Sequence, residues 1–419
     1  GDSSGFQIQT GSTTGAIAIT SQTGNITLAG SNDQEATTYE NAIRLVAQNA
    51  ANNIRIGYDG TNAYSGNIII EGDSLQQRNI LAGSGSIAVQ STGTLTIRSA
   101  GSAFTQLRAD SGDLTFDDDW NFGATLGELT IGKSTNTHSV TIGNAITAAG
   151  PITIYGGDIT TNANITTTAA SAGISLIASG DITETGSSTI ILTTGSGSVT
   201  GGNVLLAADS DGTSGGYIRY GDGLTINSYG GNITLGGGNA SGSGYAEGSA
   251  QATAEGVRVE GGLTFNSNGG NIALRGKAWV GTTGTSYGAW GVGWFTGASS
   301  INSGTGTILI DGKSYDTFTG TSYAFGTLFG GAGTTITSAN TTASAITIIG
   351  DASNAASIGA EGVAAWSSGN LEITATGSGG GITITSTGGA NDPQSITFDD
   401  PAYILANGGD MSITSSSTN

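Results

Sequence analysis

Three consecutive carboxylates, Asp117, Asp118 and Asp119, stand beside a tryptophan in the stretch TFDDDWNFG. Two carboxyl groups at a suitable separation could serve as general acid and base in the hydrolysis of a polysaccharide. Neighbouring residues of a strand point to opposite faces, however, so the three side chains would not converge on one substrate. The stretch ITFDDPAY, which contains Asp399 and Asp400, repeats the pattern of an apolar residue followed by Thr-Phe-Asp-Asp. This recurrence favours a turn at a strand end, and we predict no catalytic residue.

The same aspartates are candidate ligands for calcium, because this cation prefers hard oxygen ligands. Asp209 and Asp211 add a further pair at alternate positions of ADSDG. None of these stretches has the loop length or the terminal glutamate of an EF-hand. The candidate metal ligands are therefore Asp117, Asp118, Asp119, Asp209, Asp211, Asp399 and Asp400, with solvated acidic turns as the alternative. No other cofactor is expected.

Large aromatic side chains concentrate between Trp279 and Phe329. If the chain forms slender coils, these side chains do not all fit inside, and exposed rings can stack on a glycan or on a partner protein. The alternative is that they fill a locally wider core. The candidate binding residues are Trp279, Tyr287, Trp290, Trp294, Tyr315 and Tyr323.

The elements that would position these residues are short strands. Units such as GNITL at 24–28 and 231–235, GNIAL at 270–274 and GTILI at 306–310 recur along the chain. Their period of two places Ile, Leu and Val on one face and Thr or Ser on the other, which predicts half-buried strands. We expect the glycine that opens each unit to adopt the positive φ of a tight corner.

A longer repeat organises these strands. GDGLTINSYGGNITLGG at 221–237 aligns with EGGLTFNSNGGNIALRG at 260–276, at a spacing of 39 residues. Repeats of this length are typical of solenoids, in which stacked coils bury a common interior. We predict an all-β solenoid with three short strands per coil and variable projecting loops, for example at 236–255 and 275–289.

This solenoid is expected to form one continuous rod, with short irregular coils in residues 1–216 and longer repeats in 217–419. Residues 35–51 fit the pattern less well. Tyr39, Ile43 and Val46 have helical spacing, whereas Ile43, Leu45 and Ala47 alternate. We expect strand there, with an amphipathic helix as the alternative.

Composition narrows the functional classes. The formal net charge is −20, from 31 acidic and 11 basic residues, and the basic residues are scattered. Nucleic acid is therefore an unexpected partner, because phosphate binding needs clustered Lys and Arg. The absence of cysteine excludes disulfides and thiolate chemistry. No apolar stretch approaches the length of a membrane span, and we expect a chain that does not insert into membranes.

The Gly-Asn-Ile-Thr-Leu units with Gly/Ser/Asn turns resemble the repeats of filamentous haemagglutinin-type exoproteins of bacterial two-partner secretion, as does the larger arrangement at 217–350. The resemblance implies a right-handed parallel β-helix, export to the medium or the bacterial cell surface, and roles in adhesion and biofilms. The Asn-Pro-Asn motifs of the family's secretion domain do not occur in this sequence.

We therefore expect a non-enzymatic, secreted or surface-bound solenoid: the shaft of an adhesin or the subunit of an extracellular filament. Neither end of the sequence shows an amphipathic cap, which suggests head-to-tail self-association or contact with other surface proteins. The alternative is a polysaccharide-binding or polysaccharide-degrading β-helix of the pectate-lyase or phage-tailspike kind. Ice binding is a third hypothesis, and the irregular turn lengths disfavour it.

Overall fold

The structure is a computed structural model of the chain. It describes residues 6–10, 15–30, 42–47, 53–73, 75–78, 87–104, 114–116, 120–213, 215–250, 253–279, 287–316, 321–356, 358–367, 369–391, 394–399 and 401–417. These residues contain strands, turns and irregular segments but no helix, so none of them forms a helix that could cross a membrane. The chain divides into two compact units, residues 1–174 and 175–419.

In the first unit, each coil consists of three strands, which belong to three different sheets at its start, whereas further along β14 and β17 share the sheet of β12 and β15. A strand pairs in parallel with the third strand that follows it, as Phe6 with Ile43 shows. The described strands of this unit are β1 (Phe6–Gln9), β4 (Ile43–Val46) and β7 (Leu75–Arg78) in one sheet; β2 (Ala16–Ile19), β5 (Asn53–Ile56), β8 (Ile87–Val89) and β11 (Trp120–Phe122) in a second; β3 (Ile26–Ala29), β6 (Ile68–Glu71), β9 (Thr94–Arg98), β12 (Glu128–Ile131) and β15 (Ile152–Gly156) in a third; β10 (Leu114–Phe116), β13 (Val140–Ile142) and β16 (Ile159–Thr161); and the pair β14 (Ile146–Ala148) and β17 (Ile165–Thr167).

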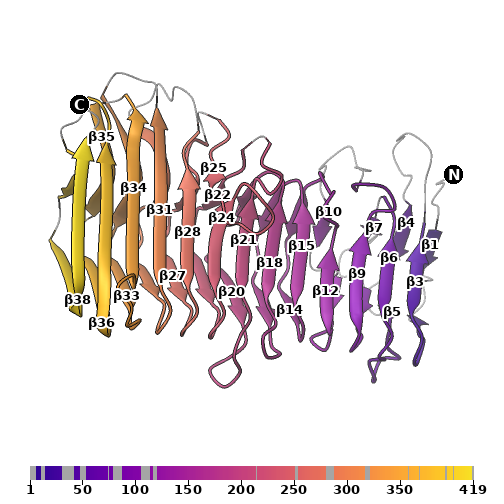
Figure 1. The fold of residues 1–419 in the computed structure, drawn as a ribbon. Helices are drawn as coiled ribbons and strands as arrows, with labels where there is room; N and C mark the ends of the chain where they lie inside the picture. The colour runs from indigo at the N-terminus through magenta and orange to yellow at the C-terminus, as the bar shows by residue number, and fades with distance from the viewer. Residues whose placement is uncertain are drawn as a thin grey trace. The chain divides into compact units, whose positions relative to one another are not determined.

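The second unit is built from the same three-strand coil, and its later strands, which are longer, lie side by side in Figure 1. Strand β18 (Ile174–Ala178) spans the boundary between the units. The three rows of the second unit are β19 (Ile182–Thr183), β22 (Ile218–Tyr220), β26 (Val257–Val259), β29 (Tyr287–Trp294), β32 (Thr321–Gly331), β35 (Ile358–Ser367) and β37 (Ile396–Phe398); β20 (Ile190–Thr194), β23 (Leu224–Asn227), β27 (Leu263–Asn266), β30 (Ser299–Asn302) and β33 (Thr334–Ser338); and β21 (Val204–Ala208), β24 (Ile233–Gly237), β28 (Ile272–Lys277), β31 (Ile308–Asp316) and β34 (Ile346–Ala355). Strand β36 (Leu371–Gly388) pairs with both β33 and β34, and β38 (Ala402–Ser417) pairs with β36.

The predicted fold class is confirmed: the named strands pair in parallel and stack coil upon coil as a β-solenoid. The register also matches the sequence repeat. Leu224 pairs with Leu263, and Ile233 pairs with Ile272, both at the predicted spacing of 39 residues. The loop after β24 contains the short strand β25 (Ala246–Glu247), which pairs with the end of β28.

The interior is a set of apolar columns that run across the coils. Alternate residues of each strand point inward, so that Leu224, Ile226 and Leu263 are at most 1% exposed while the threonines between them are half-buried. Stacking gives each inward side chain apolar neighbours on both sides, which removes its surface from water. The alternation in the sequence therefore encodes which face of each strand forms the core.

Corner glycines have two different causes, and positive φ occurs one residue before the glycine for which it was predicted. In the paired glycines that precede β24 and β28, Gly230 and Gly269 have positive φ, whereas Gly231 and Gly270 do not. A Cβ atom at Gly270 would lie 2.0 Å from the carbonyl oxygen of Gly231 in the preceding coil. The glycine that directly precedes Asn is therefore required by the close approach of stacked coils, and the prediction of positive φ there is wrong.

Two polar ladders reinforce the corners of the second unit. Inside, the Ser267 hydroxyl donates to the carbonyl oxygens of Gly270 (2.5 Å) and of Ser303 (3.1 Å), and it is fully buried. Outside, the Asn271 side-chain oxygen accepts hydrogen bonds from the backbone N–H and the hydroxyl of Thr307, at 2.9 and 3.0 Å. Each ladder links one coil to the next.

The ambiguous segment is strand where it is described. Residues 43–46 form β4, with Ile43, Leu45 and Val46 fully buried. Residues 35–41 and 48–51 lie outside the described residues. The alternation of Ile43, Leu45 and Ala47 was thus the better guide than the helical spacing.

Candidate functional site

The acidic stretch from Asp117 to Asp119 lies outside the described residues, but the strands on both sides are described. β10 ends at Phe116 and pairs with β13, whereas β11 begins at Trp120 and pairs with β8. The chain therefore passes from one sheet to another within this stretch. Calcium binding by these carboxylates stays a prediction.

Asp209 and Asp211 lie in different environments. Asp209 is 5% exposed and has positive φ, and its backbone N–H donates to the carbonyl oxygen of Gly180 at 3.0 Å. Asp211 is exposed, and its carboxylate accepts the backbone N–H of Thr213 at 3.2 Å. Within the described ranges, no group of three or more Asp, Glu or His side chains is arranged to hold a metal ion.

The candidate aromatic residues fall into different environments. Trp279 and Tyr315 are half-buried and pack against Ala254 and Ala278. Trp294 is fully buried inside the coil, where its ring lies 5.1 Å from that of Phe329, so it presents no surface to a ligand. The indole N–H of Trp294 donates to the hydroxyl of Thr334 at 2.8 Å. Tyr287 lies in β29, and its side chain is outside the described set.

The other two candidates belong to an outer aromatic cluster, which we define as Trp290, Phe295, Tyr323, Phe325 and Trp366. All but Tyr323 pack with Leu328 and Ala364, which point away from the interior because they alternate with the inward residues of β32 and β35. Tyr323 joins through ring contacts with Phe325 and Trp366. The rings of Tyr323 and Trp366 are 4.4 Å apart at 76°, and those of Phe325 and Trp366 are 4.9 Å apart at 74°. These perpendicular contacts are the arrangement that aromatic quadrupoles favour.

Glycines explain why Trp290 lies outside while Trp294 lies inside the same strand. A Cβ atom at Gly291 would lie 2.1 Å from the backbone nitrogen of Lys313, and one at Gly326 would lie 2.3 Å from that of Asp351. The backbones of two sheets therefore meet at these glycines, and the side-chain alternation is interrupted there. Strict alternation in the sequence would have placed the two tryptophans on one face.

The second unit holds a cationic side chain against an aromatic ring at two places. The Arg258 guanidinium lies 5.3 Å from the ring centre of Trp290 and forms ion pairs with Glu255 and, at 2.8 Å, with Glu260. Such contacts combine the attraction of the ring face with that of the carboxylates. These groups are drawn from neighbouring outward positions of one sheet.

The second place is built around Tyr245. The ammonium group of Lys313 lies 4.7 Å from the Tyr245 ring centre, and the Tyr245 hydroxyl donates to the Asp311 carboxylate at 2.8 Å. Burial, and after it the hydrogen bond to Asp311, raises the pKa of Tyr245 well above its usual value. The phenol therefore stays protonated over the physiological range and keeps donating to Asp311.

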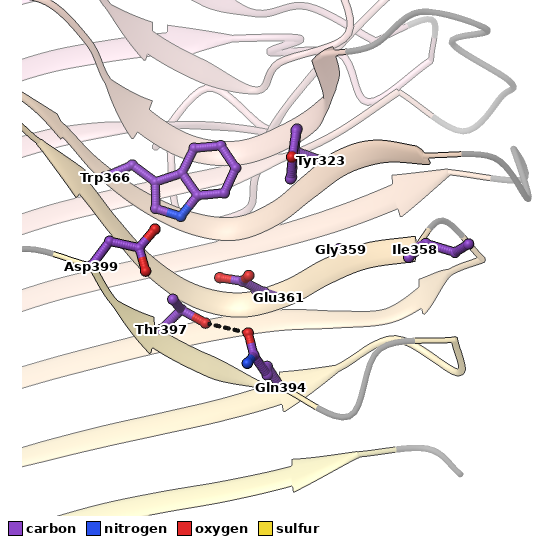
Figure 2. Close-up of a pocket in the computed structure, with 8 residues that line it drawn as sticks. All are labelled: Tyr323, Ile358, Gly359, Glu361, Trp366, Gln394, Thr397 and Asp399. Atoms are coloured by element: carbon purple, nitrogen blue, oxygen red, sulfur yellow. Dashed lines mark hydrogen bonds between the residues drawn. The ribbon is translucent and has the colours of Figure 1, made fainter.

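A groove of about 300 Å³ opens beside the outer aromatic cluster, as Figure 2 shows. Glu361 is 4% exposed, Asp399 is exposed, and Ile358 is 53% exposed. The hydroxyl of Thr397 donates to the side-chain oxygen of Gln394 at 3.3 Å. We call this the acidic groove, and its lining residues are Tyr323, Ile358, Gly359, Glu361, Trp366, Gln394, Thr397 and Asp399.

Sequence reasoning named Tyr323 and Asp399 but assigned them to different kinds of site, and it missed Glu361 and Trp366. The pairing register would have indicated that these residues lie close together, because Phe325 pairs with Glu361 on the adjacent coil. The sequence carried one signal: Trp-Gly-Val at 290–292, Phe-Gly-Thr at 325–327 and Glu-Gly-Val at 361–363 align coil upon coil. The predicted ligand Asp400 lies outside the described residues.

A second candidate site is the free edge of β38. Met411 pairs with Ile382, and Ile413 pairs with Ile384, so both extend inward-facing apolar columns. Yet Met411 is 44% exposed and Ile413 is 48% exposed. Among the described strands, only β36 pairs with β38, so the opposite edge of β38 has no partner strand among them. This edge offers backbone hydrogen-bonding groups beside uncovered apolar side chains.

No family model, curated protein or solved structure matches this chain. Functional conclusions therefore depend on the chain's own sequence and geometry.

Proposed function

We propose that the chain is a non-enzymatic structural β-solenoid that associates with further copies of itself, as the shaft of an extracellular adhesin or the subunit of an extracellular filament. The parallel solenoid provides a stiff repeating body, because each coil contacts only its neighbours. The resemblance of its repeats to filamentous haemagglutinin-type exoproteins supports a secreted or bacterial cell-surface location, with attachment to cells, matrix or biofilm.

One observation carries the proposal: among the described residues, the interior columns of the second unit extend into β38 and are uncovered on its side away from β36. Met411 and Ile413 occupy core positions but are about half exposed. Another coil stacked in register on β38 would cover both side chains and pair the open backbone edge. The free energy gained is the hydrophobic burial plus a further parallel ladder.

Charge favours a second copy as the occupant. The net charge of the chain is −20, yet β38 carries one charged residue, Asp410. The first three strands, β1, β2 and β3, carry none. Natural proteins commonly protect open edges with lysines or other charges, and neither set of strands has this protection. The first coil of one copy can therefore approach β38 of another without strong repulsion.

Electron microscopy and sedimentation of the purified protein test this proposal. We expect elongated assemblies that lengthen with protein concentration. The variant Ile413→Asp places a carboxylate in the uncovered column, and it should sediment as a single copy because stacking would bury that charge. Ser412→Asp is the matched control, because it adds the same charge at the neighbouring position, which points to the opposite side of the strand.

Two outcomes would overturn self-association. One is a wild-type protein that stays a single copy across the concentration range. The other is assembly of Ile413→Asp at the wild-type concentration, which would place the contact elsewhere.

The absence of enzymatic activity is tested separately. Incubation with acidic and neutral polysaccharides should release neither reducing ends nor unsaturated products, because the proposal assigns no acid–base pair to a substrate. Product release that is lost in Asp399→Asn would support a polysaccharide-degrading β-helix instead. Attachment of the protein to cells or to matrix-coated surfaces tests the adhesive role.

A further inference from the structure

The acidic groove combines aromatic and carboxylate groups in the way that the two internal cation sites do. Trp366 and Tyr323 form a perpendicular corner with Phe325 behind it, and Glu361 and Asp399 supply two carboxylates. No lysine, arginine or histidine is among the described residues that line it. The potential in the groove is therefore negative, from the carboxylates and from the faces of the rings.

Comparison with Arg258 shows what such a set of groups can hold. There the aromatic partner is Trp290 and the carboxylates are Glu255 and Glu260, and the cation is a side chain of the same sheet. Trp290 and Trp366 belong to the same outer aromatic cluster. The acidic groove presents the equivalent groups with a volume of about 300 Å³ in front of them, at the small end of the range for ligand sites.

The shape of the groove indicates an organic cation rather than a metal ion. Tyr323 is 43% exposed and Ile358 is 53% exposed, and Figure 2 shows Ile358 across Glu361 from Trp366 and Asp399. Their apolar surface suits an alkyl group, whereas a hard divalent cation prefers to be surrounded by oxygen ligands. Ammonium groups that carry alkyl substituents bind well against perpendicular aromatic rings, because their charge is spread over apolar surface.

We propose that the acidic groove binds an alkylammonium group, either the quaternary ammonium of a choline-like ligand or the primary ammonium of a lysine side chain. The ammonium group lies against Trp366 and Tyr323, with Glu361 below it and Asp399 at the mouth. Ile358 contacts the alkyl chain. This proposal goes beyond the stacking through β38, and the binding measurements use protein concentrations below those of assembly because Thr397 belongs to β37, the last strand of its sheet.

Titrations with choline chloride and with N-acetyl-lysine amide, followed by tryptophan fluorescence and calorimetry, test the proposal and distinguish the two sources. We expect saturable binding of at least one of them, and a decrease in affinity with rising salt. The neutral choline isostere 3,3-dimethylbutan-1-ol should bind at least tenfold more weakly, because it has the shape without the charge. Asp399→Asn should weaken cation binding several-fold, and Glu361→Gln by tenfold or more.

Glu372→Gln is the matched control, because it removes an exposed carboxylate of β36 that does not line the groove and should leave binding unchanged. Asp399 is exposed, so Asp399→Asn tests the site even if Glu361→Gln disturbs folding. The proposal is wrong if neither cation binds, or if the neutral isostere binds as tightly as choline. It is also wrong if the cation is displaced by neutral oligosaccharides that themselves bind more tightly, which would indicate a glycan site.

Discussion

The covered coils and the last coil of the second unit share one apolar pattern but differ in burial. A single column passes through Ile310, Ile348, Ile384 and Ile413 by direct register pairing. The first three side chains are fully buried, and the fourth is 48% exposed. The parallel column through Ile346 and Ile382 ends in the same way at Met411.

The difference shows that alternation in this chain defines a core position without guaranteeing its burial. Burial comes from the neighbouring coil, and each coil must have one on both sides. In covered coils the apolar residues contribute to the stability of the chain itself. In the last coil the same residue types are available for association, and the substitutions below separate these two roles.

The largest expected effect distinguishes Ile384 from Ile413. Ile384→Ala should lower the free energy of unfolding by about 2–5 kcal/mol, because it leaves a cavity in a closed interior. Ile413→Ala should cost about 1 kcal/mol, since half of its surface is already in contact with water. Urea unfolding at protein concentrations below those of assembly measures both free-energy changes. Equal changes for the two variants would show that the covered and the last coil do not differ in this way.

The buried serine ladder is expected to give the next largest effect. Ser267→Ala leaves the carbonyl oxygens of Gly270 and Ser303 without this donor inside a covered corner, and should cost about 1–3 kcal/mol. Ser416→Ala in the last coil removes a long contact at 3.5 Å to the carbonyl oxygen of Ser386 and should change stability by less than about 0.5 kcal/mol. Chemical denaturation compares them, and a larger loss for Ser416→Ala would contradict the ranking.

The exposed asparagine ladder should matter less than the buried serine ladder. Asn271→Ala removes the acceptor for the backbone N–H and the hydroxyl of Thr307, at a cost of about 1 kcal/mol. Asn271→Asp keeps an acceptor oxygen at this position and should restore most of the loss. If Asn271→Asp is as unstable as Asn271→Ala, the hydrogen bonds to Thr307 are not the cause.

The fold was predictable because period-two alternation and a long repeat are properties of the sequence itself. The alignment of Leu224 with Leu263 is the pairing register, and the strands around it follow from that match. The site was less predictable, because the glycines at 291 and 326 interrupt the alternation only where facing backbones meet. Each of these backbone contacts is between segments of two different sheets, so the local sequence pattern does not predict it.

The glycines show the same difference between local requirements and contacts between distant segments. Positive φ is a local requirement, and in these corners it occurs at Gly230, one residue before the glycine for which it was predicted. The absence of space for a Cβ atom at Gly270 is a consequence of stacking on Gly231, so it became visible only with the coils in place. Likewise, Glu361 was not predicted because its neighbours in the acidic groove come from other coils.

Hydrogen exchange of the β38 amides as a function of protein concentration is the most direct test of the central claim, that the last coil takes up another copy. The amides of β34, which pairs with β31 and β36, should be protected at every concentration. Those of β38 that face its open edge should exchange rapidly in dilute solution and become protected as the concentration rises, in parallel with assembly. Exchange at the open edge that stays rapid at all concentrations would contradict the account.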